Sequence, residues 1–514
     1  MDKKEGDGSM LPNIIVITTD QQRKDSLGCY GSNFINTPNI DRLSAEGVRF
    51  DRAYCTNPVC TPSRTSIFSG KYPGRHGAWN IGMNVAKEEV FISNLLKEKG
   101  YRTHLIGKAH FNSFQGDYDQ SVESLAHWRE RYPGFTGPYY GFDEVEMAIG
   151  HTIGGVTGHY GCAVREKFGT DDPKDMGIVR KSKKIFGGEA YDWNLPLEQT
   201  NALWTAERTV EFLQNSASNE SPFLLSVGFQ DPHHPHALPH EYAKKLNPSG
   251  IPLPHYTEGE LDNKPPHFNM AREGKLNTSH FRGEFGIAGH YLGDPNVNFL
   301  DISEEDAQLG RTYYYGLVEL IDYGIGMILE ALDKLNLSEN TIVVFTTDHG
   351  DLLGDHGLWM KGPFHYEQLI NVPLIIRWLG HIKSGMEISS LVSLADILPT
   401  IMSMCSFENP EGLDGVDLTP VIMGEANEAR DHILVECTDD PKGLRLKTIV
   451  TNRYKLTFYY GQSFGELYDL EMDPWEENNL WEIDQMMYIK AELLMKLIND
   501  FERLEKRTIR HSYS

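Results

Sequence analysis

The sequence predicts an α/β protein with a large mixed, mostly parallel sheet sandwiched between helices, followed by a smaller α+β domain that carries an antiparallel sheet. Residues 13–19 (NIIVITT) and 341–347 (TIVVFTT) are short, β-branched apolar runs typical of fully buried parallel strands. Strand and helix patterns alternate between these two runs. After about residue 425, short strand-like segments follow one another with turns between them. We therefore expect a flexible tail at 1–10, an α/β domain at 11–425 and an α+β domain at 426–514.

The elements between the two apolar runs follow from local patterns of apolar residues. Residues 38–46 and 92–98 have the spacing of amphipathic helices. Residues 101–106 and 222–229 have the composition of buried strands. Residues 304–335 keep helical spacing and lead directly into the second apolar run, as expected for a crossover between two parallel strands.

The rest of the chain divides into two irregular regions and a regular C-terminal part. Residues 112–192 and 235–298 lack clear periodicity, and we interpret both as long insertions over the active face. In the C-terminal part we expect strands at 432–437, 446–451 and 454–460 and a closing helix at 485–505.

Composition and charge limit the possible partners. Hydrophobic residues make up 40% and charged residues 24% of the 514 residues, which is the composition of a folded globular protein. The formal net charge of −25 disfavours nucleic acid and anionic membranes as partners, and no run of Lys or Arg counteracts it. A small anionic substrate would be repelled as well, so its site must be locally positive through a metal ion or clustered Lys, Arg and His.

No segment resembles a membrane span or a signal peptide. No apolar run reaches the roughly 20 residues that a transmembrane helix needs. The first ten residues, MDKKEGDGSM, are polar and lack an apolar core. We therefore expect a cytoplasmic protein, with a removed export signal as the alternative.

The six cysteines are scattered without CxxC pairs, which indicates neither a zinc site nor a disulfide framework. We expect most of them to be buried thiols. Cys60 differs because it opens the stretch CTPSR at a predicted helix start, where backbone N–H groups and the helix dipole favour an anion. Four interpretations compete for it: a structural thiol, half of a disulfide, a metal ligand, or a cysteine that is converted into another group.

The stretch from Cys60 to Arg64, with GKYP at 70–73, resembles the signature of the sulfatase family, in which this cysteine is oxidised to formylglycine. The resemblance extends in order over nearly the whole chain. Its further segments are the strand that ends at Asp20, GKAH at 107–110, PHHP at 232–235, TTDHG at 346–350, DHGLWMK at 355–361 and ELYDLEMDPWEENNL at 466–480. It implies an alkaline-phosphatase-like fold and a partner enzyme that generates the formylglycine.

The resemblance also implies a metal site and a nucleophile. A hydrated formylglycine has two hydroxyl groups, one of which attacks sulfur or phosphorus while loss of a proton from the other later releases the product. One divalent ion would be held by Asp20, Gln21, the modified Cys60, Asp348 and His349. Carboxylates suit Ca²⁺ or Mg²⁺. The family usually has two adjacent acids and Asp-Asn at these two strand ends, so Gln21 and His349 reduce the negative charge and favour Mn²⁺. With Gln21 and His349 at these positions, the chain also resembles the phosphonate monoester hydrolases.

The remaining site residues are transferred from the same motifs. Arg64 would bridge the formylglycine and the metal acids, and Lys108 and His110 would face one oxyanion. His233 matches the PHxP pattern, with His234 as its alternative. Lys361 would contact the sulfate and the leaving oxygen. His76 and Asn80 are predicted to contact the substrate, whereas the sequence assigns no role to His151, His159 or His236.

The predicted function is hydrolysis of a small sulfate ester. The alternative with the same machinery is hydrolysis of a phosphonate monoester or a phosphodiester. A non-catalytic binding protein of the same fold is disfavoured, because a pure binder needs no convertible nucleophile. The sequence leaves open whether the alcohol is a sugar, an aryl group or choline, and whether the protein forms a homo-oligomer.

Overall fold

The structure is a computed structural model of the chain. It describes residues 11–504 apart from 115–120, 152–154, 171–172, 183–187, 278, 280, 282–297 and 440–442. The tail predicted at 1–10 and the chain end at 505–514 lie outside the described residues.

A nine-stranded sheet forms the centre of the molecule, in the order β12-β2-β11-β10-β1-β8-β3-β4-β5. Its strands are β1 (Asn13–Thr19), β2 (Val48–Tyr54), β3 (Arg102–Gly107), β4 (Glu144–Gly150), β5 (Val156–Thr157), β8 (Phe223–Gly228), β10 (Thr341–Thr347), β11 (Asn371–Arg377) and β12 (Met386–Ser393). The two predicted apolar runs are β1 and β10, which pair in parallel from Asn13 opposite Thr341 to Thr19 opposite Thr347. Their carboxyl ends therefore lie side by side, as predicted.

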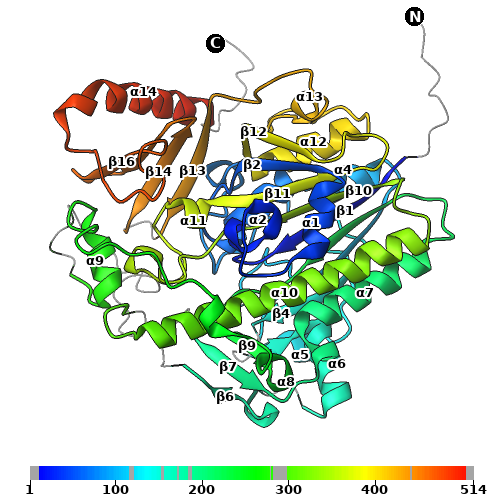
Figure 1. The fold of residues 1–514 in the computed structure, drawn as a ribbon. Helices are drawn as coiled ribbons and strands as arrows, with labels where there is room; N and C mark the ends of the chain where they lie inside the picture. Colours follow the sequence, from blue (N-terminus) through cyan, green and yellow to red (C-terminus); the bar gives the residue numbers. More distant parts are fainter. Residues whose placement is uncertain are drawn as a thin grey trace, which may run out of the picture.

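Alternate residues of the central strands pack into two cores. On β1, Ile14 and Val16 belong to one core, and Ile15 and Ile17 to the other. Because both faces are covered, these strands read as continuous apolar runs. The helices α1 (Pro38–Ala45), α7 (Asn201–Ser216) and α10 (Glu304–Lys334) cover one face, and α2 (Cys60–Ser69), α4 (Ile92–Glu98) and α12 (Ile397–Met404) contribute to the other (Figure 1).

The two irregular regions contain more regular structure than the sequence predicted. Glu144–Gly150 is not part of an insertion but the strand β4, which pairs in parallel with β3 within the main sheet. The expectation of an insertion throughout 112–192 is therefore wrong. The remaining elements of these regions are α5 (Trp128–Arg131), α6 (Gly158–Phe168), β6 (Val179–Arg180), β7 (Ala190–Trp193), β9 (His236–Pro239), α8 (His240–Ala243) and α9 (Pro266–Glu273), and β6, β7 and β9 form a three-stranded sheet.

The C-terminal part forms the predicted antiparallel sheet with one closing helix. The strands are β13 (His432–Thr438), β14 (Arg445–Thr451), β15 (Tyr454–Tyr459) and β16 (Gly465–Asp469), and each pairs antiparallel with the next. Helix α14 (Met487–Leu504) covers this sheet at one corner of the molecule, packing Leu493 and Leu497 into a core with Ile449 and Leu456 (Figure 1). The boundary at residue 425 stays a prediction.

Short helices complete the fold at α3 (Pro73–His76), α11 (Glu367–Ile370) and α13 (Thr419–Ile422). All six cysteines are free thiols, and only Cys162 is exposed. The prediction of mostly buried thiols is therefore confirmed. Over the part of the chain that the structure describes, no helix has the length and apolar character of a membrane span.

Candidate active site

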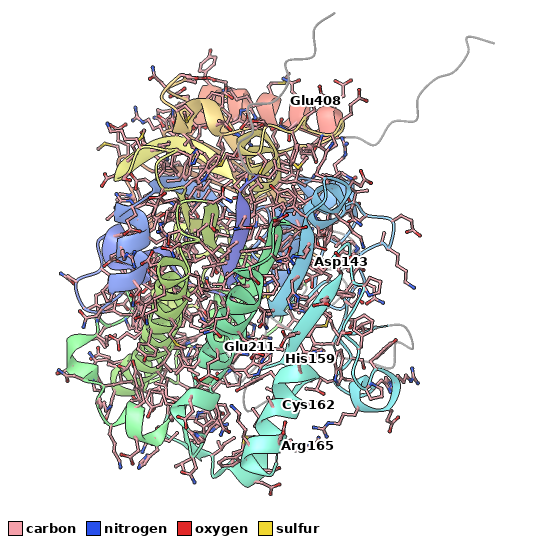
Figure 2. The ribbon with its side chains drawn as sticks, turned by 90° about the vertical axis from the view of Figure 1, so that its right-hand side faces the viewer. Asp143, His159, Cys162, Arg165, Glu211 and Glu408 are labelled. Carbon is pink, nitrogen blue, oxygen red and sulfur yellow. The ribbon has the colours of Figure 1, made fainter. Side chains whose placement is uncertain are left out.

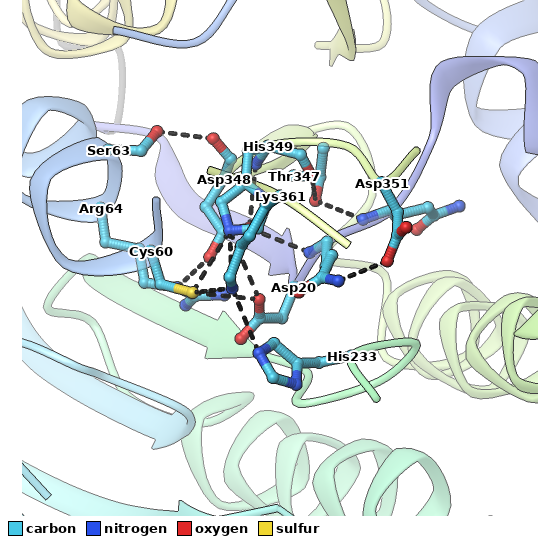
Figure 3. A network of polar contacts seen from close by, with 12 residues as sticks. Asp20, Cys60, Ser63, Arg64, His233, Thr347, Asp348, His349, Asp351 and Lys361 are labelled. Atoms are coloured by element: carbon cyan, nitrogen blue, oxygen red, sulfur yellow. Dashed lines mark hydrogen bonds and ion pairs between the residues drawn. The ribbon is translucent and has the colours of Figure 1, made fainter. Parts of the chain in front are cut away.

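The candidate site lies where the carboxyl ends of β1 and β10 meet the start of α2. Asp20 and Gln21 follow β1, Asp348 and His349 follow β10, and Cys60 is the first residue of α2. Ligands collect at this edge in open α/β sheets. Figure 3 shows the side chains of both strand ends and of α2 turned toward one another.

The sulfur of Cys60 is the point on which the other groups converge. Lys361 Nζ donates a hydrogen bond to Cys60 Sγ at 2.9 Å. His349 Nε2 lies 3.2 Å and Asp20 Oδ1 3.5 Å from the same sulfur. Burial raises the pKa of the Cys60 thiol, and the charge of Lys361 opposes this only in part. An unmodified Cys60 is therefore a neutral thiol and a poor nucleophile at neutral pH.

Asp348 is held as an anion by several donors. Arg64 Nε donates to Asp348 Oδ2 at 2.7 Å, and the backbone N–H groups of Gln21 and His349 donate to Oδ1 at 3.0 and 2.9 Å. Burial would raise the pKa of Asp348, but the neighbouring His349 and the cations, Arg64 first, hold it below its usual range. Arg64 is 1% exposed and also donates to the carbonyl of Thr19, so it locks the two strand ends together.

Hydrogen bonds fix the tautomer of His349. Its Nδ1 lies 2.9 Å from the carbonyl oxygen of Gly350, which can only accept, so Nδ1 carries the proton. The lone pair of Nε2 then points into the site. Burial lowers the pKa of His349 to about 3, so the imidazole is neutral. A neutral imidazole whose other nitrogen is bonded to a carbonyl is the usual form of a histidine metal ligand.

The amide of Gln21 has a comparable arrangement. Its Nε2 donates to Asp351 Oδ2 and lies 3.5 Å from His234 Nδ1, which leaves Oε1 as the free end. That oxygen is buried and has no hydrogen-bond partner among the described residues. A buried polar atom without a partner is costly, and a bound cation would satisfy it.

These groups fit a divalent cation. One ligand atom each from Asp20, Cys60, Asp348 and His349 lie within 4.8 Å of one another. Together with Gln21 Oε1 they offer two carboxylates, an amide oxygen, an imidazole and the side chain of residue 60. Oxygen donors suit a hard ion, and the imidazole extends the range toward Mn²⁺.

Two lysines place positive charge beside this group. Lys361 Nζ lies 3.2 Å from the Nε2 atoms of both His233 and His349. Lys108, just after β3, forms an ion pair with Asp20. Burial lowers the pKa of Lys108 to about 7, against the opposing effect of Asp348. The two lysines supply the locally positive environment that an anionic substrate requires in a protein of net charge −25.

His233 and His110 complete the predicted catalytic set. His233 Nδ1 donates to the carbonyl of His234 at 2.5 Å, so its Nε2 has a lone pair facing Lys361. Neither ring nitrogen of His110 has a hydrogen-bond partner in the described part of the chain. Burial, followed by the charge of Lys108, holds the pKa of His110 well below its ordinary value.

The structure does not bring the two predicted substrate contacts to the group around Cys60. His76 Nε2 pairs with Ser66 Oγ at 3.0 Å, and its Nδ1 accepts from the backbone of Ala78 at 3.2 Å. Asn80 Nδ2 donates to the carbonyl oxygens of Thr438 and Asp439. Both side chains are thus used inside the fold.

Two groups that support the site were not predicted from the sequence. The carboxylate of Glu123 accepts hydrogen bonds from the backbone N–H groups of His110, Phe111 and Asn112 at 2.7 to 2.9 Å. It thereby fixes the loop that carries His110. Glu123 lies in the region without periodicity, and no sequence signal marks it. Asp351, by contrast, lies only three residues after Asp348 and could have been found as a further acid beside the strand end.

Comparisons with known proteins agree with this arrangement. A family model described as Sulfatase matches residues 12–406, and a second, N-sulphoglucosamine sulphohydrolase, C-terminal, matches 354–503. The chain therefore belongs to the sulfatase family and is a sulfuric ester hydrolase.

Individual relatives match over most of their length. The chain is 29% identical over 500 residues to an uncharacterised sulfatase of Escherichia coli (strain K12), covering 96% of this chain and 88% of that protein. It is 29% identical over 483 residues to an arylsulfatase of Clostridium perfringens (strain 13 / Type A), covering 92% and 90%. A phosphonate monoester hydrolase of Agrobacterium radiobacter superposes with a TM-score of 0.77 at 23% identity over 96% of each chain, which shows a common fold.

Proposed function

We propose that the protein hydrolyses a small sulfate ester with formylglycine, formed from Cys60, as nucleophile and with one bound divalent ion. The observation that carries the proposal is the convergence of Lys361, His349 and Asp20 on the sulfur of Cys60. A structural thiol has no need of a lysine ammonium at 2.9 Å. A buried thiol with a raised pKa would itself be inactive, which supports conversion to a different nucleophile.

The ion would be held by Asp20, Gln21, Asp348, His349 and the modified residue 60. We propose Ca²⁺, with Mn²⁺ or Mg²⁺ as alternatives, because the donor set contains oxygen atoms and one imidazole. When bound, the ion would lower the pKa of the nucleophilic hydroxyl and offset negative charge on the substrate.

The residues of the chain supply the remaining functions. Lys361 and Lys108 bring two ammonium groups to the side where the sulfate oxygens would lie, which stabilises charge that develops there. The Nε2 of His233 accepts from Lys361 and is placed to orient that ammonium as the proton donor to the leaving alcohol. His110 is a buried, neutral imidazole whose ring nitrogens have no hydrogen-bond partner among the described residues, and we propose it as the base that receives the proton released when sulfate leaves.

Mass spectrometry and kinetics test this proposal together. The protein should be produced with a formylglycine-generating enzyme, which is the partner that the mechanism requires. The peptide that contains residue 60 should then have the mass of formylglycine, and the protein should turn over 4-nitrophenyl sulfate in a metal-dependent way. Fully converted, metal-loaded protein without activity on aryl, sugar or choline sulfates would contradict the proposal.

Hydrolysis of a phosphonate monoester or a phosphodiester is the second candidate. The observation that favours it is the presence of Gln21 and His349 among the proposed ligands, because a set with two acids leaves the site more positive than a set with three would. A more positive site suits a phosphoryl group. The two candidates are distinguished by measuring kcat/KM for a sulfate ester and a phosphonate monoester of the same phenol.

A further inference from the structure

One histidine outside the proposed machinery contacts it on two sides. His151 is the first residue after β4, so it lies at the same edge of the sheet as the other site residues. Its ring is stacked on the ring of His233, with centroids 3.9 Å apart and planes inclined by 8°. Its Nε2 lies 3.3 Å from Lys108 Nζ. The proposed mechanism leaves this side chain without a role.

A second metal ion is one candidate role for His151, but the available ligands disfavour it. Ligand atoms of Asp20, His151 and His233 lie within 4.8 Å of one another. However, the Nε2 atoms of the two rings face Lys108 and Lys361 at 3.3 and 3.2 Å. Asp20, the only carboxylate of this group, is already a proposed ligand of the first ion. The two imidazoles therefore act as acceptors for the lysines.

We propose that His151 is a positioning residue with two separable actions, an inference that rests on the proposed function. Its Nε2 holds the ammonium of Lys108 at the sulfate-binding side of the site. Its ring fixes the plane of His233 and so keeps the Nε2 of His233 directed at the ammonium of Lys361, which donates the proton to the leaving oxygen. The first action affects binding of the anion, and the second affects departure of the alcohol.

Each of the two actions depends on a different contact of His151. Lys108 has a flexible stem, and its ammonium contacts His151 in addition to Asp20. Loss of a hydrogen bond that involves a charged group weakens binding by about tenfold or more. His233 is anchored at Nδ1 by the carbonyl of His234, which leaves rotation of its plane to be restricted by the stacked ring.

Two substitutions separate the actions. His151→Phe keeps an aromatic ring beside His233 and removes the acceptor for Lys108. His151→Gln removes the ring and keeps a carbonyl oxygen that can accept from Lys108. His159→Gln serves as matched control. His159 lies at the start of α6 (Figure 2), and its Nδ1 accepts a hydrogen bond from the backbone N–H of Met147 on β4.

We expect the two variants to differ in kind. For H151F, the KM for 4-nitrophenyl sulfate and the calorimetric Kd for inorganic sulfate should rise about tenfold, with an unchanged rate ratio of 4-nitrophenyl to phenyl sulfate. For H151Q, the Kd for inorganic sulfate should stay within about twofold, while kcat for phenyl sulfate falls about tenfold more than kcat for 4-nitrophenyl sulfate. The poorer leaving group depends more on a correctly oriented proton donor, here the ammonium of Lys361 held by the Nε2 of His233, which is why the ratio changes.

Other results would overturn the inference. Equal effects of both variants on binding and on the leaving-group ratio, or effects that His159→Gln reproduces, would make His151 merely structural. A second equivalent of metal that disappears in H151F would make it a ligand. Converted wild-type protein that turns over no sulfate ester would refute the proposed function instead, and sulfate calorimetry would still decide the contact with Lys108: unchanged binding in H151F, or no binding to either protein, would refute it.

Discussion

At the scale of single residues, the site depends on Cys60. Its side chain is 1% exposed at the first position of α2, where a small residue is tolerated. We expect Cys60→Ala to fold and to bind metal but to lose at least about a hundredfold in kcat, because nucleophile losses usually cost several powers of ten. Steady-state kinetics with circular dichroism and metal analysis check this.

A buried cysteine away from the site provides the control for this substitution. Cys405 is 4% exposed and accepts a hydrogen bond from Tyr101, remote in sequence from every site residue. Cys405→Ala should keep its activity while losing some stability. If Cys60→Ala retained more than about a hundredth of the wild-type kcat, residue 60 would not be the nucleophile.

The neutral ligands Gln21 and His349 set the charge of the metal site. The double substitution Gln21→Asp with His349→Asn adds one carboxylate and removes the imidazole. We expect the ratio of kcat/KM for sulfate over phosphonate esters to rise and the metal preference to move toward Ca²⁺, since a hard ion favours oxygen donors. Parallel assays with Ca²⁺- and Mn²⁺-loaded protein measure both effects. An unchanged ratio in a folded, metal-loaded double variant would show that ligand charge does not determine the substrate atom.

At the scale of elements, the strands that are buried on both faces could be predicted from the sequence. The strands β1 and β10 have apolar, β-branched sequences because each contributes to two cores. The strand β4 was missed, since Glu144 and Glu146 interrupt its apolar pattern. In the fold Glu146 pairs with Arg208 on α7, a partner that lies far away in the sequence. Partners of this kind are not encoded in local periodicity.

The same limit applies to the site. The strand-end acids, Cys60 and the lysines could be predicted because short motifs carry them. The position of His76 could not, because its contact with Ser66 depends on the packing of the short helix α3 against α2. The site role that we infer for His151 depends in turn on placing β4 next to β3 in the sheet.

The loop after β3 provides a test at this scale. Its backbone is held by Glu123, and an amide at this position would place an N–H donor against the N–H donors of residues 110–112. We expect Glu123→Gln to lower kcat/KM about tenfold to a hundredfold through displacement of His110. Tyr139→Phe, which removes only the hydroxyl bond of 2.6 Å to Glu123, should have a smaller effect. If the E123Q protein were less stable but kept the wild-type kcat/KM, Glu123 would contribute to stability and not to catalysis.

The attachment of α14 should depend on pH. His432 on β13 lies 2.8 Å from Asp500 on α14, and the hydrogen bond to Asp500, against the effect of burial, raises the pKa of His432 above 6.5. A raised histidine pKa means that the contact stabilises fully below the ordinary pKa and is lost as pH rises through the raised value. We expect protection of amides 487–504 from hydrogen exchange, corrected for intrinsic rates, to decrease over that range.

Substitution of the histidine should remove this dependence. The glutamine in His432→Gln cannot become charged, so the backbone amides of α14 should exchange at a corrected rate that does not change with pH. The control is His381→Gln. His381 is an exposed loop histidine that stacks on Trp378, and this variant should behave as the wild type. The same pH dependence in H432Q would assign the effect to another group.

At the scale of the whole molecule, the charge of the protein and the charge required by its substrate are opposed. The chain has 73 Asp and Glu against 48 Lys and Arg. The site contains Lys108, Lys361 and Arg64, but Asp20 and Asp348 offset most of this charge in the absence of an ion. A bound divalent ion therefore makes the site positive within a protein whose long-range field is negative.

This opposition predicts how the reaction responds to salt. Screening acts over about 10 Å at 0.1 M ionic strength, so it weakens the repulsion by distant carboxylates more than the attraction by ammonium groups in contact with the substrate. We expect kcat/KM for an anionic aryl sulfate to rise about two- to threefold between 0.01 and 0.15 M KCl, with kcat unchanged. Stopped-time assays at constant free metal concentration measure this. A fall in kcat/KM over the same range would mean that the cations of the site dominate the field along the whole approach path.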